Sequence, residues 1–162
     1  MNPAVRYGTP DDLEFITGLE RDNLALPWSE EAVLDLLRYD PAGGDRVFKF
    51  ALVAEGAGYV SVSGVIDEAE VGNIVVAPEC RGRGYGRMLL EELGNILASR
   101  GIGKIFLEVE STNQSALSLY RRCGFAEYGI RKGYYGEGRD ALLMSKELQI
   151  REQGGDQYRC DA

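Results

Sequence analysis

Apolar residues recur every three or four positions in four segments of the chain, the spacing that gives an amphipathic helix one buried face. In the first segment this face consists of Leu13, Ile16 and Leu19, and the second begins at Ser29, a residue type that caps helices well. The pattern predicts helices over residues 9–21, 29–38, 85–100 and 113–123.

Short apolar runs bounded by glycine, proline or acidic turns predict strands between these helices. Three consecutive runs are joined by short turns and should form an antiparallel meander, whereas the strands on either side of the third helix should lie parallel. The predicted strands cover residues 5–7, 47–54, 59–65, 69–76, 104–109, 126–135 and 141–148.

The resulting order, β-α-α-β-β-β-α-β-α-β-β, predicts an α/β fold with a mixed, mostly antiparallel sheet of seven strands and four helices. A chain of 162 residues suits one domain with a sizeable core, and we place this domain at residues 1–150. Residues 151–162 contain few apolar side chains and are expected to form a disordered tail.

The segment 73–90 combines a β-branched apolar run, a basic glycine-rich loop and the start of a helix. Such a loop can bind an anion, because glycines allow close approach and the amides at a helix N-terminus are free. The residues that suit this role are Gly82, Gly84, Gly86, Arg81, Arg83 and Arg87. Their spacing fits neither the P-loop nor the dinucleotide fingerprint. We therefore predict a phosphate-bearing cofactor here; the alternative is an ordinary connection whose arginines serve solubility.

The charge of the chain narrows the choice of partner. A formal net charge of −8 argues against binding along a nucleic-acid backbone and suits a cationic partner such as a basic peptide. Negative charge also serves solubility, so this indication is not specific. No apolar run is long enough to span a membrane, and the N-terminus lacks the apolar stretch of a signal peptide.

The chain contains no histidine, which excludes Ser-His and Cys-His nucleophile pairs and the usual zinc ligand. Proton transfer would therefore fall to Glu, Asp, Tyr, Lys or water. Cys80, Cys123 and Cys160 form no C-x-x-C pair, so neither a disulfide framework nor a metal site is predicted. A reducing cytoplasm fits this usage, with Cys160 freely reactive in the tail.

A carboxylate, an amide and a phenol follow the third helix. Glu108 alternates with Leu107 and Val109, so its side chain should point to the opposite face of the strand. Asn113 and Tyr120 lie two helical turns apart and should share one helix face. Each also has a simpler interpretation: a solvated acid at a strand end, a helix cap and a core aromatic.

These motifs together resemble a known family. The pattern R-x-x-G-x-G at residues 81–86 is similar to the acetyl-CoA pyrophosphate loop of the GCN5-related N-acetyltransferases (GNAT). The segment LEVESTNQSALSLYRRCGF resembles, within that family, the ribosomal-protein-alanine N-acetyltransferases, as do Pro27-Trp28-Ser29, Asp67-Glu68-Ala69-Glu70 and Arg131-Lys132-Gly133-Tyr134-Tyr135. The resemblance covers residues 4–148 and implies the GNAT fold, in which two parallel strands splay apart around the cofactor.

The resemblance also implies roles for individual residues. Glu108 would be the general base, and Tyr120 would donate a proton to the departing CoA thiolate. Tyr134 and Tyr135 would shape the entry for the substrate peptide, with Trp28 nearby; these three aromatic residues would otherwise serve packing. The residues expected to hold the cofactor are Ile74, Val75, Val76, Arg81, Gly82, Arg83, Gly84, Tyr85, Gly86 and Asn113.

The function expected from this resemblance is direct acetyl transfer from acetyl-CoA to the N-terminal α-amine of a peptide or protein, such as a small-subunit ribosomal protein beginning with alanine. We expect a cytoplasmic enzyme that needs no metal and contacts neither nucleic acid nor membrane. One alternative is a GNAT enzyme that acts on a small amine or a lysine side chain. Another is a non-catalytic CoA-binding domain, against which the presence of Glu108 and Tyr120 argues.

Overall fold

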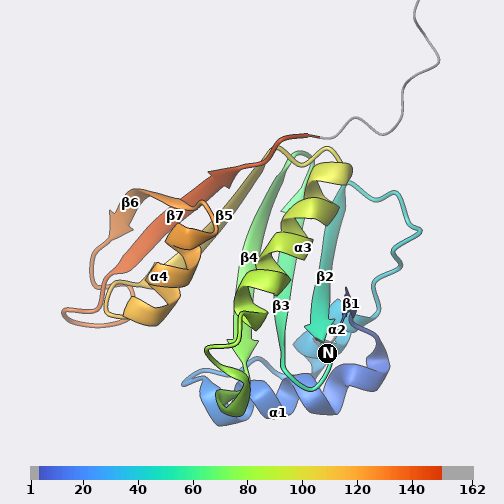
Figure 1. Cartoon of the computed structure of the whole chain (residues 1–162), viewed down its shortest axis with the longest axis horizontal. Helices are drawn as coiled ribbons and strands as arrows, with labels where there is room; N and C mark the ends of the chain where they lie inside the picture. The colour runs from blue at the N-terminus through green and yellow to red at the C-terminus, as the bar shows by residue number, and fades with distance from the viewer. Residues whose placement is uncertain (1–3, 151–162) are drawn as a thin grey trace, which may run out of the picture.

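The computed structural model describes residues 4–150, which form a seven-stranded sheet with helices on both faces (Figure 1). The strands are β1 (Val5–Tyr7), β2 (Val47–Ala54), β3 (Gly58–Val65), β4 (Glu68–Val76), β5 (Lys104–Glu110), β6 (Ala126–Arg131) and β7 (Ala141–Glu147). Their spatial order is β1-β2-β3-β4-β5-β7-β6, and only the β4–β5 pair is parallel. The predicted fold class, meander and parallel pair are thus confirmed. The predicted tail at 151–162 lies outside the described residues.

The core has two parts, one on each face of the sheet. The helices are α1 (Leu13–Asn23), α2 (Glu30–Leu37), α3 (Tyr85–Ser99) and α4 (Gln114–Arg122), with short 3-10 turns at Pro10–Asp12 and Pro78–Cys80. The larger core includes fully buried Leu93 of α3 and Leu52 of β2. The smaller one includes Ile16 of α1 and Tyr59 of β3. Burial of each such large side chain contributes about 1.5–3 kcal/mol, which holds the helices on the sheet.

The two parallel strands separate soon after they meet. β4 pairs with β5 only over Glu68–Glu70, opposite Lys104–Phe106. Beyond this point β4 continues to pair with β3 as far as Val76, and β5 pairs with β7 as far as Glu110. Figure 1 shows the two strands diverging, with α3 beside β4 and α4 beside β5. Within residues 4–150, the edge of β4 at positions 71–76 therefore has no partner strand.

A β-bulge lies in β4 where the strands begin to diverge. The β3–β4 register passes from Val62 opposite Val71 to Val60 opposite Ile74. Two residues of β4, at positions 72 and 73, consequently lie opposite a single residue of β3, Ser61. Such a bulge increases local twist and redirects the strand, which helps β4 turn away from β5.

One predicted boundary is wrong. β6 ends at Arg131 rather than at residue 135, so Tyr134 and Tyr135 lie in the loop before β7. Gly133, Gly136 and Gly138 in this loop have positive φ angles, which an extended strand cannot accommodate. The other predicted helices and strands are present, and most of their ends differ by no more than two residues. The exception is the start of the first helix, where a 3-10 turn at Pro10–Asp12 precedes α1 at Leu13. None of the helices within residues 4–150 has the length and apolar character needed to cross a membrane.

Candidate active site

The free edge of β4 presents two backbone amides. The amide of Ala77 donates to Ala57 O of the β2–β3 connection at 2.7 Å, so it points toward the β3 side. Because amides alternate along a strand, Val75 also points toward β3, while Ile74 and Val76 point to the side from which β5 has diverged. The β4 edge can therefore donate hydrogen bonds to an extended ligand lying beside it.

The glycine loop after β4 is open and shaped for an anion. Gly82 and Gly84 have φ angles of 77° and 88°, and a Cβ at either position would meet nothing within 4 Å. Gly84 caps α3, and the first helix amide that donates back to it is that of Met88, at 3.0 Å. The amides of residues 85–87 therefore have no hydrogen-bond acceptor among residues 4–150, and together with the helix dipole they favour a negatively charged group.

The first turn of α3 is in contact with α4. A Cβ at Gly86 would lie 2.9 Å from the Cδ2 atom of Leu119, closer than real side chains approach. Glycine at this position therefore lets the two helices pack closely. The contact therefore joins the helix that begins at the glycine loop to the helix that carries Tyr120.

The three loop arginines differ in what they contact. Arg81 donates to Val76 O at 3.1 Å and to Asn23 Oδ1 at 3.1 Å, so it ties the loop to the end of α1. Arg87 forms an ion pair with Glu91 one helical turn away, at 2.7 Å. Arg83 is exposed and makes no described interaction with any residue from 4 to 150. Of the three, Arg83 is the side chain with a guanidinium available to a ligand.

Glu108 lies on β5 as predicted, on the face opposite Leu107 and Val109. Its carboxylate is 3.2 Å from a guanidinium nitrogen of Arg131, and 23% of its side-chain area is exposed. The same guanidinium lies 5.6 Å from the centre of the Tyr134 ring. Arg131 therefore connects the predicted base to the predicted substrate loop, a contact that sequence analysis missed because it joins β5 to β6.

Tyr120 lies on the other side of β5. It is 6% exposed and packs in the core that contains Leu107 and Val109, with its ring centre 6.0 Å from that of Phe125. Burial raises the pKa of Tyr120 to about 12, with smaller contributions from Tyr135 and Cys123. The phenol therefore stays protonated at neutral pH and remains able to donate a proton.

The two loop tyrosines lie beside these groups. Tyr134 and Tyr135 make an edge-to-face contact with ring centres 5.0 Å apart and are 54% and 37% exposed. Burial raises the pKa of Tyr135, and the neighbouring carboxylate of Glu108 raises it further. Because Tyr135 interacts electrostatically with both Glu108 and Tyr120, the loop approaches both of the predicted catalytic residues.

Asn113 caps α4, since its side-chain oxygen accepts the amide of Ala116 at 3.1 Å. The capping interpretation is thus confirmed. A contact between Asn113 and the cofactor stays a prediction. Cys123, at the other end of α4, is a buried free thiol.

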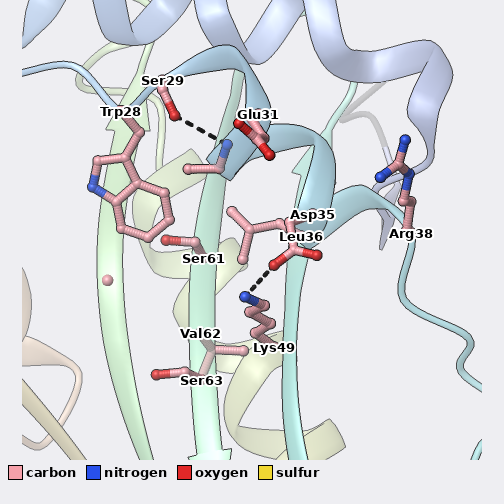
Figure 2. A pocket seen from close by; sticks show the side chains of 12 residues that line it. Trp28, Ser29, Glu31, Asp35, Leu36, Arg38, Lys49, Ser61, Val62 and Ser63 are labelled. Carbon is pink, nitrogen blue, oxygen red and sulfur yellow. Dashed lines mark hydrogen bonds and ion pairs between the residues drawn. The ribbon is translucent and has the colours of Figure 1, made fainter.

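Trp28 lies in the connection between α1 and α2 and is 38% exposed. Figure 2 shows its indole above the strands, at one end of a groove of about 510 Å³ that also contains Ser61 and an ion pair between Asp35 and Lys49. The ring lies against Gly72 of the β4 bulge, where a Cβ would be 3.1 Å from the nearest ring atom. Trp28 therefore anchors its loop on the bulge, and the exposed part of its ring lines the groove beside it.

The arrangement as a whole offers a carboxylate on one side of β5, a protonated phenol on the other, and a polar strand edge leading to an anion-binding loop. Within residues 4–150, no group of three or more His, Cys, Asp or Glu side chains is placed to hold a metal ion. The carboxylate, the phenol and the open loop are suited to acid–base chemistry on a ligand that carries phosphate.

Comparisons with known proteins show the family of this chain. The acetyltransferase (GNAT) family matches residues 13–125. The [ribosomal protein bS18]-alanine N-acetyltransferase of Escherichia coli K12 is 37% identical over 144 residues, which cover 86% of this chain and 93% of the relative. The enzyme of the same name from Haemophilus influenzae is 33% identical over 140 residues, covering 83% and 91%.

A solved structure shows the same fold. The crystal structure of the ribosomal-protein-S18-alanine N-acetyltransferase from Escherichia coli superposes with a TM-score of 0.75 at 33% identity, covering 98% of this chain and 99% of that one. The family match, the curated relatives and the solved structure thus agree on the family and the fold. The chain belongs to the acetyltransferase (GNAT) family.

Proposed function

We propose that this acetyltransferase moves the acetyl group of acetyl-CoA directly to the N-terminal α-amine of a basic peptide or protein. Glu108 is the general base and Tyr120 the general acid. The names of the relatives suggest the natural acceptor, a ribosomal protein that begins with alanine. Such an acceptor implies that the enzyme works in the cytoplasm.

The observation that carries the proposal is the position of Glu108 and Tyr120 on opposite sides of β5, next to the free edge of β4. An amine that approaches from the Glu108 side can lose its proton to the carboxylate, directly or through one water molecule. Tyr120, which stays protonated because it is buried, can donate a proton on the other side. The base thus takes a proton from the attacking amine, and the acid gives one to the departing CoA thiolate. Because the amine attacks the thioester directly, no covalent enzyme intermediate is needed.

The residues present fit acetyl-CoA, the cosubstrate of GNAT acetyltransferases. The amides of Ile74 and Val76 would bind its extended arm, and the open loop at 82–86 would hold its pyrophosphate. Arg83 would supply a positive charge and Asn113 a polar contact. When bound, acetyl-CoA supplies the activated thioester.

The chemistry of the acceptor favours an α-amine over a lysine. An α-amino group has a pKa near 7.7–8.0 and lysine near 10.4, so the α-amine costs roughly 3.4 kcal/mol less to deprotonate. A carboxylate base is better matched to the α-amine. The net charge of −8 adds attraction for a basic chain.

A panel of acceptors tests the proposal. The enzyme is incubated with acetyl-CoA and, separately, with alanine-initiated basic peptides, the same peptides with a blocked N-terminus, and small polyamines; product masses are then compared. We expect acetylation of the free peptides alone. Turnover on polyamines or on blocked peptides, without turnover on free ones, would contradict the proposal.

A further inference from the structure

Glu20 of α1 is a completely buried acid outside the groups assigned above. It is 0% exposed and accepts hydrogen bonds from three other segments. The donors are the Tyr59 hydroxyl of β3, the Asn73 side-chain amide of β4 at 2.8 Å, and the Trp28 backbone amide at 2.7 Å. Burial of a carboxylate is unfavourable unless donors compensate for the lost water, and here both oxygens are satisfied.

All three partners of Glu20 are hydrogen-bond donors, which suits a carboxylate that accepts charge-assisted hydrogen bonds. Burial, and then the hydrogen bond to Glu20, raise the pKa of Tyr59 far above its ordinary value, so this phenol remains a donor. The Asn73 side chain donates through its nitrogen, and the Trp28 backbone can only donate through its amide. Hydrogen bonds of this kind are stronger than neutral ones, so they fix the positions of their donors.

One of these donors belongs to the β4 bulge. The backbone amide of Asn73 also donates to Ser61 Oγ at 2.8 Å, so this residue is held from two directions. A Cβ at the adjacent Gly72 would lie 2.6 Å from the same oxygen, so the backbone here lies directly against β3. The bulge lies where β4 leaves β5, next to the Ile74 and Val76 amides proposed to bind acetyl-CoA, which we call the proposed acetyl site.

Another donor belongs to the loop that carries Trp28. The indole lies on Gly72 of the bulge, and Figure 2 shows it facing Ser61 across the end of the groove. Glu20 thus holds the bulge and the Trp28 loop at the same time, one through a side chain and the other through the backbone.

We propose that Glu20 is a positioning residue for acetyl transfer, which sets the distance between Trp28 and the β4 bulge so that the acceptor enters at the proposed acetyl site. The inference rests on the proposed function, because it takes Trp28 as part of the acceptor wall. A purely structural role would stabilise the fold but leave acceptor binding and the environment of Trp28 unchanged.

Trp28 is the single tryptophan of the chain, so its fluorescence reports directly on this loop. In Glu20→Gln, a side-chain amide replaces one acceptor oxygen and faces a donor. We expect the KM for an alanine-initiated peptide to rise about tenfold, the size expected from loss of one hydrogen bond to a charged group. The KM for acetyl-CoA stays unchanged, and the Trp28 emission shifts to longer wavelength with stronger acrylamide quenching.

Asp12→Asn is the matched control. Asp12 is a second buried acid near α1, where it is bound by Arg6 at 2.8 Å and by the Thr9 amide at 2.8 Å, so the same chemical change should lower stability only. Tyr59→Phe removes one donor and keeps the carboxylate, and should shift fluorescence and peptide KM in the same direction but less. This variant also serves if Glu20→Gln fails to fold.

The proposal is overturned if a folded Glu20→Gln or Tyr59→Phe protein has wild-type peptide KM and Trp28 emission, or if Asp12→Asn changes both equally. Failure of the proposed function gives a different result. In that case the wild-type enzyme acetylates no α-amine, while the fluorescence comparison still decides whether Glu20 fixes the position of Trp28.

Discussion

At the scale of single residues, the proposed base and acid lie on opposite faces of β5, because successive side chains of a strand point to opposite faces. Glu108 points to one face of β5, beside Arg131, while Tyr120 packs on the opposite face among apolar side chains. The different surroundings suit different tasks, since a partly exposed carboxylate can accept a proton and a buried phenol retains one.

Glu108→Gln and Tyr120→Phe should each lower kcat by about 10²- to 10⁴-fold, the usual contribution of a positioned acid or base. Neither substitution removes a residue proposed to hold acetyl-CoA, so titration calorimetry should give unchanged cofactor affinity. Steady-state kinetics on an alanine-initiated peptide provide the check. Wild-type kcat in both variants would show that the assigned roles are wrong.

Residues with local sequence signals could be predicted, and those defined by distant contacts could not. The alternation around Glu108 and the helical spacing of Asn113 and Tyr120 are visible within a short segment. Arg131 and Glu20 became apparent only in the fold, because their partners come from other strands and loops. The apolar pattern of α1 does not distinguish a buried acid from a solvated one.

At the scale of secondary-structure elements, the periodicity of the sequence predicted nearly every helix and strand. The parallel β4–β5 pair also followed from the helix between them. The early end of β6 did not, because the strand pattern runs on into a loop whose glycines have positive φ. The β4 bulge was likewise not predicted, since it depends on a register shift against β3.

The cap of α3 provides a test at this scale. Gly84→Ala should destabilise the protein by about 1–2 kcal/mol, because alanine is strained at a φ of 88° although its Cβ has open space. It should also weaken CoA binding, since the loop amides would shift. Thermal unfolding with and without CoA measures both effects.

Gly94→Ala is the control for this prediction. Gly94 lies inside the same helix, and a Cβ there would make only an ordinary contact of 3.8 Å with Leu148. Alanine should therefore stabilise the protein by about 0.5–1 kcal/mol and leave CoA binding unchanged. Equal effects of the two substitutions would contradict the proposed role of the loop.

At the scale of the whole molecule, buried phenols make folding stability sensitive to alkaline pH. The pKa of Tyr120 is raised to about 12 and that of Tyr59 is raised further, chiefly by burial. The unfolded chain loses these protons near pH 10. Above that pH the unfolded state binds fewer protons than the folded state, so the free energy of unfolding falls as pH rises.

Between pH 10 and the folded pKa, each of these tyrosines should lower stability by about 1.4 kcal/mol per pH unit. Tyr120→Phe removes one titrating group, so its stability should fall less steeply than that of the wild type. Denaturant unfolding from pH 8 to 11.5 measures both curves. Parallel curves would show that the Tyr120 phenol is not shielded in the folded state.

The most direct test of the central claim uses one basic peptide that begins with alanine and also contains an internal lysine. After incubation with acetyl-CoA and enzyme, tandem mass spectrometry locates the added acetyl group. The account predicts a single acetyl group on the alanine α-amine with the wild-type enzyme, and almost none with Glu108→Gln. Acetylation of the lysine instead, or equal product from both proteins, would contradict it.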